Sequence, residues 1–179
     1  MISARKPPGQ VNLFAGAIYA PGAPLDAVRE RLTGVFGAVD LESPPLPFTH
    51  TDYYAEEMGG NLTRVFFSFA ELIPPERIAD AKLITNGIEL EFARERGGAP
   101  RRTVNLDPGC LDLSKVVLAT TKNYAHRIYL RDGIYAEATL RFHKGTFRPW
   151  EWTYPDYRTE EYVSFFNEAR KLFKRKLSG

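Results

Sequence analysis

The chain is organised around residues 101–142, which read RRTVNLDPGCLDLSKVVLATTKNYAHRIYLRDGIYAEATLRF. Alternating apolar and polar positions predict three or four strands within this stretch. An unusual set of polar side chains lies between the apolar positions: Asn105, Asp107, Lys122, His126, Arg127 and Glu137. None of their spacings matches a motif with fixed chemistry, so the stretch indicates where a site lies and leaves open what it does.

The second half of this stretch predicts a β-hairpin. Alternation over 134–142 sets Glu137 on the face opposite the apolar residues. A three-residue loop at 131–133, with its glycine in the left-handed conformation, pairs residue 130 with 134, 128 with 136 and 127 with 137. Arg127 then lies opposite Glu137, and His126 falls on the apolar side. Two interpretations of the charge pair stay open: a solvated pair on an exposed sheet face, or part of a functional site.

Length and composition are those of an ordinary globular protein. The 179 residues are 44% hydrophobic and 26% charged, and the net charge is +2. This length fits a single domain, predicted over 1–179, which buries about two thirds of its unfolded surface. The small net charge predicts no particular partner. Nucleic-acid binding is disfavoured, because it usually requires a strongly basic face.

Cysteine usage and hydropathy narrow the cellular setting. Cys110 is the single cysteine, so no intramolecular disulfide forms and a reducing compartment is indicated. The residue follows a predicted turn and has no identified base partner. No apolar run approaches about 18 residues, and the N-terminus lacks the apolar run of a signal peptide. We expect a cytoplasmic protein that does not contact the membrane.

Residues 10–106 follow the order strand, helix, strand, strand, helix, strand, after an N-terminal arm at 1–9. The expected elements are strands at 10–20, 39–42 and 62–70, helices at 25–37 and 76–96, and a last strand that ends near 106. This is the order of the split βαβ, ferredoxin-like unit. Hairpin strands at 113–142 extend its sheet, and a helix at 158–177 packs on it. The predicted fold class is α+β: a ferredoxin-like βαββαβ core, additional antiparallel hairpin strands and a C-terminal helix.

The helix predicted at 76–96 carries a polar stripe. Four of its side chains stand at i, i+3, i+4 and i+7 and so project from one side: Lys82, Thr85, Asn86 and Glu89. A solvated helix face shows the same mixture, so a structural explanation and a functional one both stay open. Gly87 favours function, because glycine in a helix interior costs about 1 kcal/mol relative to alanine unless another backbone or a ligand comes close.

The segment at 48–60 is predicted to be an ordered loop that covers the site. It contains oxygen and imidazole groups suited to a divalent metal: His50, Asp52, Glu56 and Glu57. Their spacing fits no specific metal motif. The run 105–109 is predicted to be a turn, in which Asp107 caps the following backbone and Gly109 takes a positive φ. The chain contains neither a phosphate-binding loop motif nor a dinucleotide-binding glycine motif.

Several motifs, in order along the chain, resemble those of one family. They are Lys82-x-x-Thr85-Asn86-x-x-Glu89, Asn105-Leu-Asp107-Pro-Gly, Ala119-Thr-Thr-Lys122-x-x-x-His126-Arg127, Gly133-Ile-Tyr-Ala-Glu137 and Trp152-Thr-Tyr-Pro-Asp156-Tyr. From about residue 8 to 176 the chain is similar to a bacterial family catalogued as domain of unknown function 4416. The family has no established activity. The resemblance therefore implies only that these polar residues belong to one shared site.

The mixture of cations and carboxylates predicts a site for a small phosphorylated or nucleotide-like ligand. Catalytic roles are assigned to four residues: Glu89, Asp107, His126 and Glu137. Ligand-binding roles are assigned to six: Lys82, Thr85, Asn86, Asn105, Lys122 and Arg127. Whether the protein is an enzyme stays open, as does a divalent metal as its cofactor.

Two alternatives come from other classes of protein. An RNA-binding sheet would present Phe66, Tyr129 and Tyr135 for base stacking. A scaffold that acts through protein contacts would use an aromatic patch made of Trp150, Trp152, Tyr154 and Tyr157. The sequence leaves the oligomeric state open.

Short connections between elements predict that the polar residues meet in space. The second helix, the end of the fourth strand and the hairpins should line one cleft with seven side chains: Lys82, Asn86, Glu89, Asn105, Lys122, Arg127 and Glu137. The loop at 51–59 would form the rim of this cleft.

Overall fold

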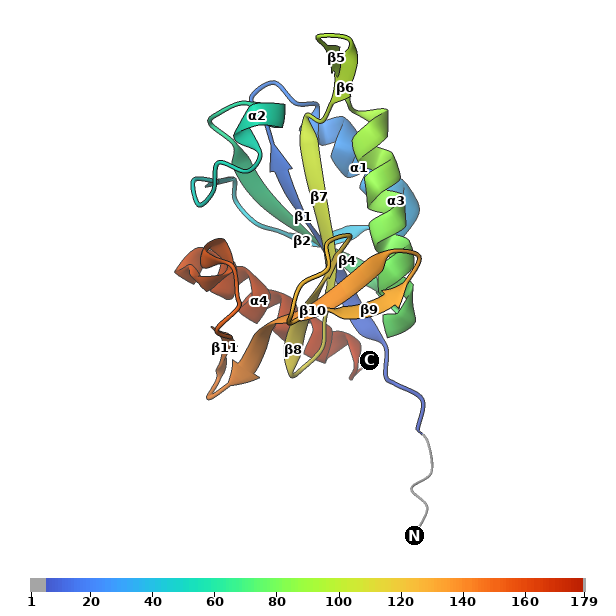
Figure 1. Ribbon diagram of the computed structural model, residues 1–179. Coiled ribbons are helices and arrows are strands. Elements are labelled where there is room, and N and C mark those ends of the chain that lie inside the picture. Colours follow the sequence, from blue (N-terminus) through green and yellow to red (C-terminus); the bar gives the residue numbers. More distant parts are fainter. Residues whose placement is uncertain (1–5, 179) are drawn as a thin grey trace.

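The computed structural model describes residues 6–178, which form a large antiparallel sheet and four α-helices (Figure 1). The strands follow the spatial order β11-β10-β8-β7-β1-β4-β2, with β3 beside β4 and β9 beside β10. The predicted α+β class is therefore confirmed. The first five residues of the predicted N-terminal arm lie outside the described residues, as does Gly179.

The sheet is built from nine strands. They are β1 (Val11–Tyr19), β2 (Val39–Glu42), β3 (Leu46–Pro47), β4 (Thr63–Ile73), β7 (Val104–Leu111), β8 (Lys115–Thr120), β9 (Ile128–Arg131), β10 (Ile134–His143) and β11 (Thr146–Pro149). A separate hairpin consists of β5 (Arg94–Arg96) and β6 (Ala99–Arg101). The helices are α1 (Leu25–Phe36), α2 (Ala55–Met58), α3 (Ile78–Glu91) and α4 (Glu160–Lys176), and 3₁₀ turns lie at η1 (Pro75–Arg77) and η2 (Pro155–Arg158).

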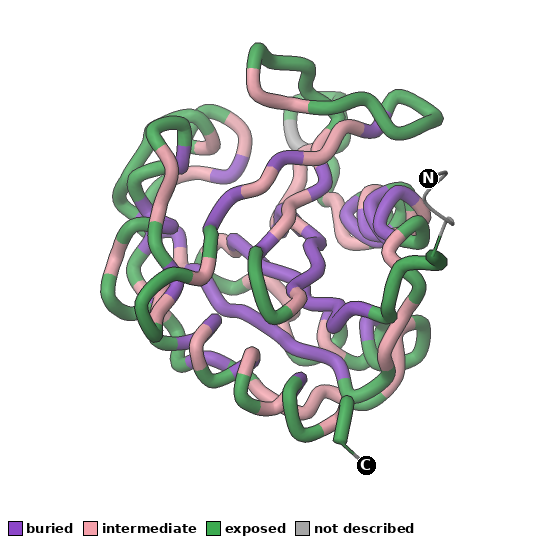
Figure 2. Tube along the Cα trace, turned by 90° about the horizontal axis from the view of Figure 1, so that it is seen from below, coloured by how far each residue is buried: buried purple, intermediate pink, exposed green. Residues whose placement is uncertain are grey.

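The central strand β1 separates two hydrophobic cores, because its side chains alternate between the faces of the sheet. Leu13 and Ala15 pack in a core with buried residues of α1 and α3. Phe14 packs on the other face with Phe166 of α4, at a ring-centroid distance of 4.9 Å. Figure 2 shows this buried centre surrounded by exposed loops. The sheet is thus covered by helices on both faces.

Most of the predicted elements are confirmed, and one helix is shorter than expected. The strands at 10–20, 39–42 and 62–70, the helix at 25–37 and the C-terminal helix at 158–177 match β1, β2, β4, α1 and α4 to within a few residues. The helix predicted over 76–96 ends at Glu91, and the chain then forms the β5–β6 hairpin. Gly97 and Gly98 both have positive φ, 64° and 78°, as a two-residue hairpin turn requires.

The turn predicted at 105–109 is wrong, because these residues lie inside strand β7. Asp107 pairs with Gly16 of β1, and Gly109 pairs with Phe14. A Cβ atom on Gly109 would lie 2.3 Å from Phe14 Cζ and 2.5 Å from the Val117 carbonyl oxygen. Close packing explains this glycine, where the sequence suggested a positive φ. Cys110 likewise lies in a buried strand and not after a turn.

The hairpin of β9 and β10 has a shorter loop than predicted. Asp132 and Gly133 both have positive φ, 52° and 75°, so a two-residue turn pairs Arg131 with Ile134. A register shift follows at once and restores the pairing of residue 128 with residue 136. The predicted loop and the pairing of 130 with 134 are wrong, whereas the pairing of 128 with 136 is confirmed.

Candidate functional site

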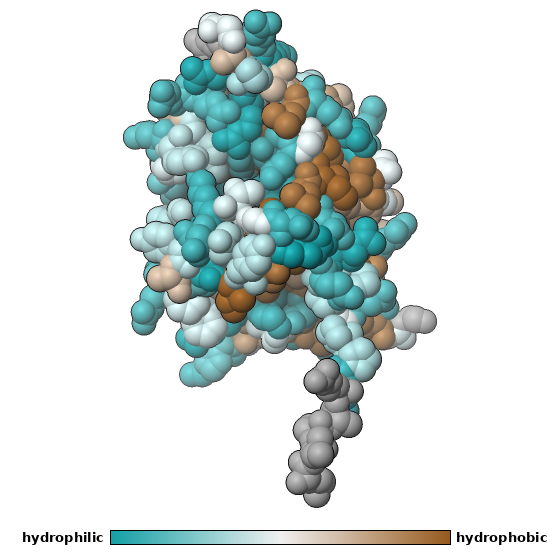
Figure 3. Space-filling view, turned by 45° about the vertical axis from the view of Figure 1, so that its right-hand side comes forward, coloured by the Kyte–Doolittle hydropathy of each residue, from teal (hydrophilic) through white to brown (hydrophobic). Residues whose placement is uncertain are grey.

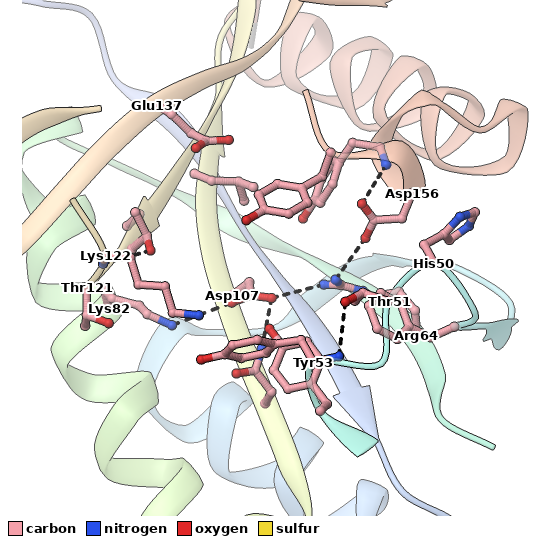
Figure 4. A pocket seen from close by; sticks show the side chains of 18 of the residues that line it. His50, Thr51, Tyr53, Arg64, Lys82, Asp107, Thr121, Lys122, Glu137 and Asp156 are labelled. Carbon is pink, nitrogen blue, oxygen red and sulfur yellow. Dashed lines mark hydrogen bonds and ion pairs between the residues drawn. The ribbon is translucent and has the colours of Figure 1, made fainter. Parts of the chain in front are cut away.

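The sheet opens between β7 and β8, and this opening is the candidate site. The two strands pair over residues 109–111 of β7, whereas β7 pairs with β1 along its whole length. A cavity of about 450 Å³ lies beyond the last paired residues. Side chains of α3, β7, η2, the end of β8 and the 48–54 loop line it (Figure 4). We call this cavity the cleft.

Side chains of α3 satisfy the backbone of β7 where β8 no longer pairs with it. Lys82 Nζ donates to the Leu106 carbonyl at 2.7 Å, and the Leu106 N–H donates to Glu89 Oε1 at 2.5 Å. Both side chains are buried. Burial raises the pKa of Glu89, and Lys82 and the Leu106 N–H offset part of this shift. An unpaired buried backbone group costs roughly 1–3 kcal/mol, so Lys82 and Glu89 stabilise the open edge of β7.

Arg64 of β4 and two carboxylates form the floor of the cleft. Arg64 is 2% exposed, and its two terminal nitrogens donate to Asp107 Oδ2 and Asp156 Oδ2, each at 3.3 Å. Gly16 of β1 leaves room for the guanidinium, since a Cβ atom there would lie 2.7 Å from Arg64 Nη1. Four aromatic rings surround the cation: Phe48, Phe66, Tyr157 and Tyr162. We use "floor" for Arg64, Asp107 and Asp156.

The two floor carboxylates have pKa values shifted in opposite directions. Burial acts to raise the pKa of Asp107, but Lys82 and Arg64 outweigh it and hold the pKa below its ordinary value. Burial dominates at Asp156, and Arg64 offsets only part of it, so that pKa lies above its ordinary value. Lys82 contributes most to lowering the pKa of Asp107, because its Nζ lies 3.7 Å from Asp107 Oδ1. The side chain of Asp107 is 25% exposed, whereas that of Asp156 is 7% exposed.

Glu137 of β10 lies in the wall of the cleft and is held by three side chains. Its Oε2 atom accepts from Arg127 Nε at 2.8 Å and from His126 Nε2 at 3.0 Å. Thr139 Oγ1 donates to the other oxygen at 3.3 Å. Glu137 is 3% exposed, so the predicted cross-strand pair is buried, and the interpretation as a solvated surface pair is wrong.

An aromatic stack holds His126 behind Glu137. The imidazole lies parallel to the Trp152 ring at 5.7 Å, and Trp152 stacks on Trp150 at 5.2 Å. Arg141 lies over the outer face of Trp150, with Cζ at 4.4 Å from the ring centroid. Trp152 is fixed in turn by the hydrogen bond from its Nε1 to a carbonyl of β10. His126 therefore orients Glu137 and does not itself line the cleft.

Lys122 and Tyr53 meet at the mouth of the cleft. The Lys122 ammonium lies 3.7 Å from the centroid of the Tyr53 ring, and both residues are exposed. The backbone of Lys122 is fixed on both sides, because its N–H donates to Thr120 Oγ1 at 3.2 Å and its carbonyl accepts from Arg127 Nη1 at 3.0 Å. We use "mouth" for Lys122 and Tyr53, which Figure 4 shows on the side of the cleft away from Asp156.

Arg102 ties the rim of the cleft to its interior. Its guanidinium donates to Glu57 Oε2 at 2.6 Å, to Asn105 Oδ1 at 2.8 Å and to Glu89 Oε2 at 3.3 Å. The hydrogen bond from Arg102 holds the pKa of Glu57 below its ordinary value. Through this contact the loop that carries α2 is fixed over one end of the cleft.

The structure brings most of the predicted site residues together. Eight of the ten line the cleft: Lys82, Asn86, Glu89, Asn105, Asp107, Lys122, Arg127 and Glu137. The predicted rim contributes Thr51, Tyr53 and Tyr54. Thr85 is fully buried in α3 and donates to the Lys82 carbonyl, so its position is structural. The roles proposed for the eight lining residues stay predictions.

Gly87 lies inside α3, where the sequence suggested a close approach by another backbone or a ligand, but no such neighbour is present among the described residues. No atom lies within 4 Å of the position that a Cβ atom would take. Leu83 and Leu90, on the same exposed side of α3, are 41% and 68% exposed. Figure 3 brings this side forward and shows apolar side chains among hydrophilic ones. Gly87 therefore points away from the cleft and is no part of the site.

Arg64, Arg102, Asp156 and Tyr157 are among the cleft residues that sequence reasoning did not assign to the site. An arginine on the same strand face as Phe66, inside a strongly apolar strand, was the signal for Arg64. Asp156 and Tyr157 lie in the Trp152-Thr-Tyr-Pro-Asp-Tyr motif, which was noticed as part of a family pattern, and Tyr157 was assigned only to an aromatic patch for protein contacts. No local signal marks Arg102, because its partners come from three separate elements.

The groups suggested for a metal do not gather in the described part of the chain. Residues 6–178 contain no group of three or more His, Cys, Asp or Glu side chains that could hold a metal ion. Glu57, one of the four candidates, binds Arg102.

Cys110 is buried in β7, and burial raises the pKa of its thiol to about 12. Since the thiolate is the reactive form, Cys110 is no nucleophile at neutral pH.

The surfaces predicted for RNA binding and for scaffolding are only partly formed. Phe66 is fully buried beneath α4, stacked on Phe165 at 5.1 Å, and so is closed to a base. Tyr157 is 3% exposed and belongs to the core. Tyr129 and Tyr154 remain exposed. Across residues 6–178, no helix is long and apolar enough to cross a membrane.

Comparison with known proteins gives one match. The family model described as "Domain of unknown function (DUF4416)" covers residues 9–173. Neither a curated protein nor a solved structure matches the chain.

Proposed function

The chain belongs to the DUF4416 family, whose description names no ligand, and we propose that its cleft binds a small phosphorylated or nucleotide-like ligand. The cleft volume of about 450 Å³ lies within the range of about 300–1,000 Å³ that is usual for small-molecule sites. Both aromatic rings and polar groups line it, as they do where a ligand has an apolar body and charged groups.

The charge balance of the cleft is the observation that carries this proposal. Five cations line it: Arg64, Lys82, Arg102, Lys122 and Arg127. Four carboxylates face them: Glu89, Asp107, Glu137 and Asp156. Each of the four is paired with a cation of the protein. An anionic ligand fits the remaining positive charge, because buried or half-buried cations bind phosphate through charge-assisted hydrogen bonds.

Tyr157 offers a second, uncharged contact. Its hydroxyl is buried, has no hydrogen-bond partner among the described residues, and belongs to a side chain that lines the cleft. Buried polar groups are normally hydrogen-bonded, and an unsatisfied one at a cavity supports a partner supplied by a ligand. A phosphorylated compound with hydroxyl or base groups could bind Tyr157 and a cation at the same time.

Asp107 is the residue best placed to act chemically on such a ligand. It is the most open of the four carboxylates, and its low pKa keeps it charged at neutral pH. A charged carboxylate accepts hydrogen bonds, so Asp107 would serve as an acceptor for a donor group of the ligand, and its low pKa would make it a weak general base. We assign Glu137 to orienting Arg127, and His126 to positioning Glu137, because His126 does not face the cavity.

Thermal-shift and calorimetric screening tests the proposal. Nucleoside monophosphates, sugar phosphates and pyrophosphate should raise the melting temperature, with and without Mg²⁺. A ligand at a hundredfold excess over its Kd stabilises by about 2.7 kcal/mol, which gives a shift of roughly several degrees at this chain length. The matched controls are the parent nucleosides and sugars, which lack the phosphate. If phosphorylated and unphosphorylated compounds both leave the melting temperature unchanged, the proposal fails.

We further propose that β7, β1, β4 and β2 with α1 and α3 form a ferredoxin-like core within a single domain. The support is the chain order of strand, helix, strand, strand, helix, strand and the antiparallel pairing of each neighbour in this group. The two cores on either side of β1 share the same sheet, which favours one cooperative unit. Coincident unfolding transitions by circular dichroism and tryptophan fluorescence would support the single domain.

A further inference from the structure

Three of the five cations in the cleft already serve the protein. Arg64 binds the two floor carboxylates. Lys82 binds the Leu106 carbonyl and lies near Asp107. Arg102 bridges the rim, β7 and α3 through carboxylate and amide oxygens. A ligand that recruited any of them would leave buried carboxylates or backbone groups without a partner, which opposes binding.

Two cations remain, and the fold holds them together. Lys122 has no carboxylate partner among residues 6–178, and its charge is met only by the Tyr53 ring. Arg127 uses Nε for Glu137 and Nη1 for the Lys122 carbonyl, while Nη2 has no hydrogen-bond partner in the described part of the chain. The hydrogen bond from Arg127 Nη1 ties its guanidinium to the backbone of Lys122, so the two residues lie side by side in the lining of the cleft. Glu137 shares its charge between Arg127 and His126, so it neutralises Arg127 less than a dedicated partner would.

Resting on the proposed function, we propose that the phosphoryl group of the ligand binds Lys122 and Arg127 at the mouth of the cleft, in competition with Tyr53. The planar guanidinium and the ammonium together offer several donors to phosphate oxygens. The Tyr53 ring occupies one side of the ammonium, at 3.7 Å from its nitrogen. A doubly charged phosphate is a stronger partner for an ammonium than an aromatic face, so the ligand displaces the ring from it.

Tyr53 is placed to move without cost to the core. Tyr53 is 59% exposed, its ring contacts the Tyr54 ring and the Lys122 ammonium, and its N–H donates to Thr51 Oγ1. The neighbouring Tyr54 is packed against Phe48, and so the loop stays in place when the Tyr53 ring turns. Tyr53 therefore acts as a gate that covers Lys122 until phosphate arrives.

Two substitutions with opposite expected effects test this assignment. Inorganic pyrophosphate is titrated into the full chain by calorimetry, so that no base or sugar obscures the phosphate contact. Lys122→Met should bind about tenfold more weakly, because a charge-assisted contact is lost. Tyr53→Leu should bind about threefold more tightly, because the ring no longer competes. The exposed Lys174 of α4 provides the matched control, since Lys174→Met removes the same charge far from the cleft and should leave the affinity unchanged.

Proton NMR gives a direct readout of the displacement. The ε-methylene protons of Lys122 should be shifted upfield by the Tyr53 ring in the free protein and should move downfield as pyrophosphate binds.

The phosphate subsite is overturned if Lys122→Met binds pyrophosphate as well as the wild type does, and the gate is overturned if Tyr53→Leu binds it more weakly or equally. Binding of pyrophosphate by the wild type with no effect of either substitution would leave the proposed function standing and remove only this subsite. Absence of binding by the wild type overturns the subsite, and absence across all phosphorylated compounds overturns the proposed function as well.

Discussion

The floor and the mouth of the cleft both contain a cation beside aromatic rings, but the two cations are held in different ways. Arg64 at the floor is 2% exposed and binds two carboxylates that are 43 and 92 positions away in the sequence. Lys122 at the mouth is exposed, and among the described residues its ammonium meets only the exposed ring of Tyr53. The floor is therefore part of what keeps the fold together, whereas the mouth is free to exchange its partner. Not every charged residue that lines a cavity is available to a ligand. Charges already paired within the protein stabilise the fold, and charges without such a partner can bind a ligand.

The largest expected effect is at the floor. Arg64→Met keeps most of the side-chain volume but leaves Asp107 and Asp156 without their shared cation. Removing one partner of a buried ion pair costs about 3–5 kcal/mol, and we expect a loss of this size in the free energy of unfolding. Urea denaturation at pH 7 measures it.

The matched control for this substitution is Arg29→Met on α1. Arg29 also binds two carboxylates, Asp26 and Glu42, but its side chain is 36% exposed. Surface pairs contribute about 0–1 kcal/mol each, so the control should lose far less stability. Equal losses in the two variants would contradict the distinction between a buried floor and a solvated pair.

A smaller effect is expected on the pH dependence of the free energy of unfolding. This dependence should differ in sign between the two floor carboxylates. The folded-state pKa of Asp107 lies below its ordinary value, so its contribution to stability is present above about pH 3.9 and is lost as the pH falls through the folded pKa. The folded-state pKa of Asp156 lies above its ordinary value, so its contribution is present below about pH 3.9 and is lost as the pH rises through the folded pKa.

Asn variants should therefore differ from the wild type with opposite pH slopes. From pH 7 down to 3, the stability deficit of Asp107→Asn should shrink. From pH 3 up to 7, Asp156→Asn should gain stability relative to the wild type, because asparagine resembles the neutral form that folding favours at this position. Urea denaturation of all three proteins at several pH values measures both slopes. Parallel curves for the two variants would show that Lys82 does not distinguish the two carboxylates.

The elements of the fold could be predicted from the sequence wherever periodicity extended over many residues. The strand β1 and the helix α4 carry unbroken apolar patterns, and their predicted bounds lie within a few residues of the observed ones. Predictions from short motifs failed more often. Pro108-Gly109 is typical of a turn, yet both residues pair with β1 and lie inside a strand. Position 109 needs glycine because a Cβ atom there would clash with the ring of Phe14. The register of the β9–β10 hairpin differed for a similar reason, because two positive φ angles and a bulge replaced one longer loop.

The candidate site could be located from the sequence, but the residues that stabilise the fold could not be distinguished from those available to a ligand. Lys82 and Glu89 were expected to meet a ligand, and the structure shows them paired with the backbone of Leu106, where β8 leaves β7. No sequence pattern reveals where two strands of a sheet separate. Arg64 was missed because an arginine within an apolar strand looks like an exposed residue until its partners from β7 and η2 are known.

The smallest expected effect on the free energy of unfolding is at the mouth, because its cation is exposed and, unlike Arg64 at the floor, binds no carboxylate of the described residues. An exposed cation–π contact contributes about 0.5–1 kcal/mol, so Lys122→Met and Tyr53→Leu should each lower the free energy of unfolding by no more than about this amount. Since the contact joins the two side chains, the double variant should lose no more than either single one, with a coupling energy of about 0.5 kcal/mol. Urea denaturation of the four proteins completes this double-mutant cycle. A loss at Lys122 comparable to that at Arg64 would mean that the mouth, like the floor, is structural, and a ligand would then have to bind through Nη2 of Arg127 without the help of Lys122.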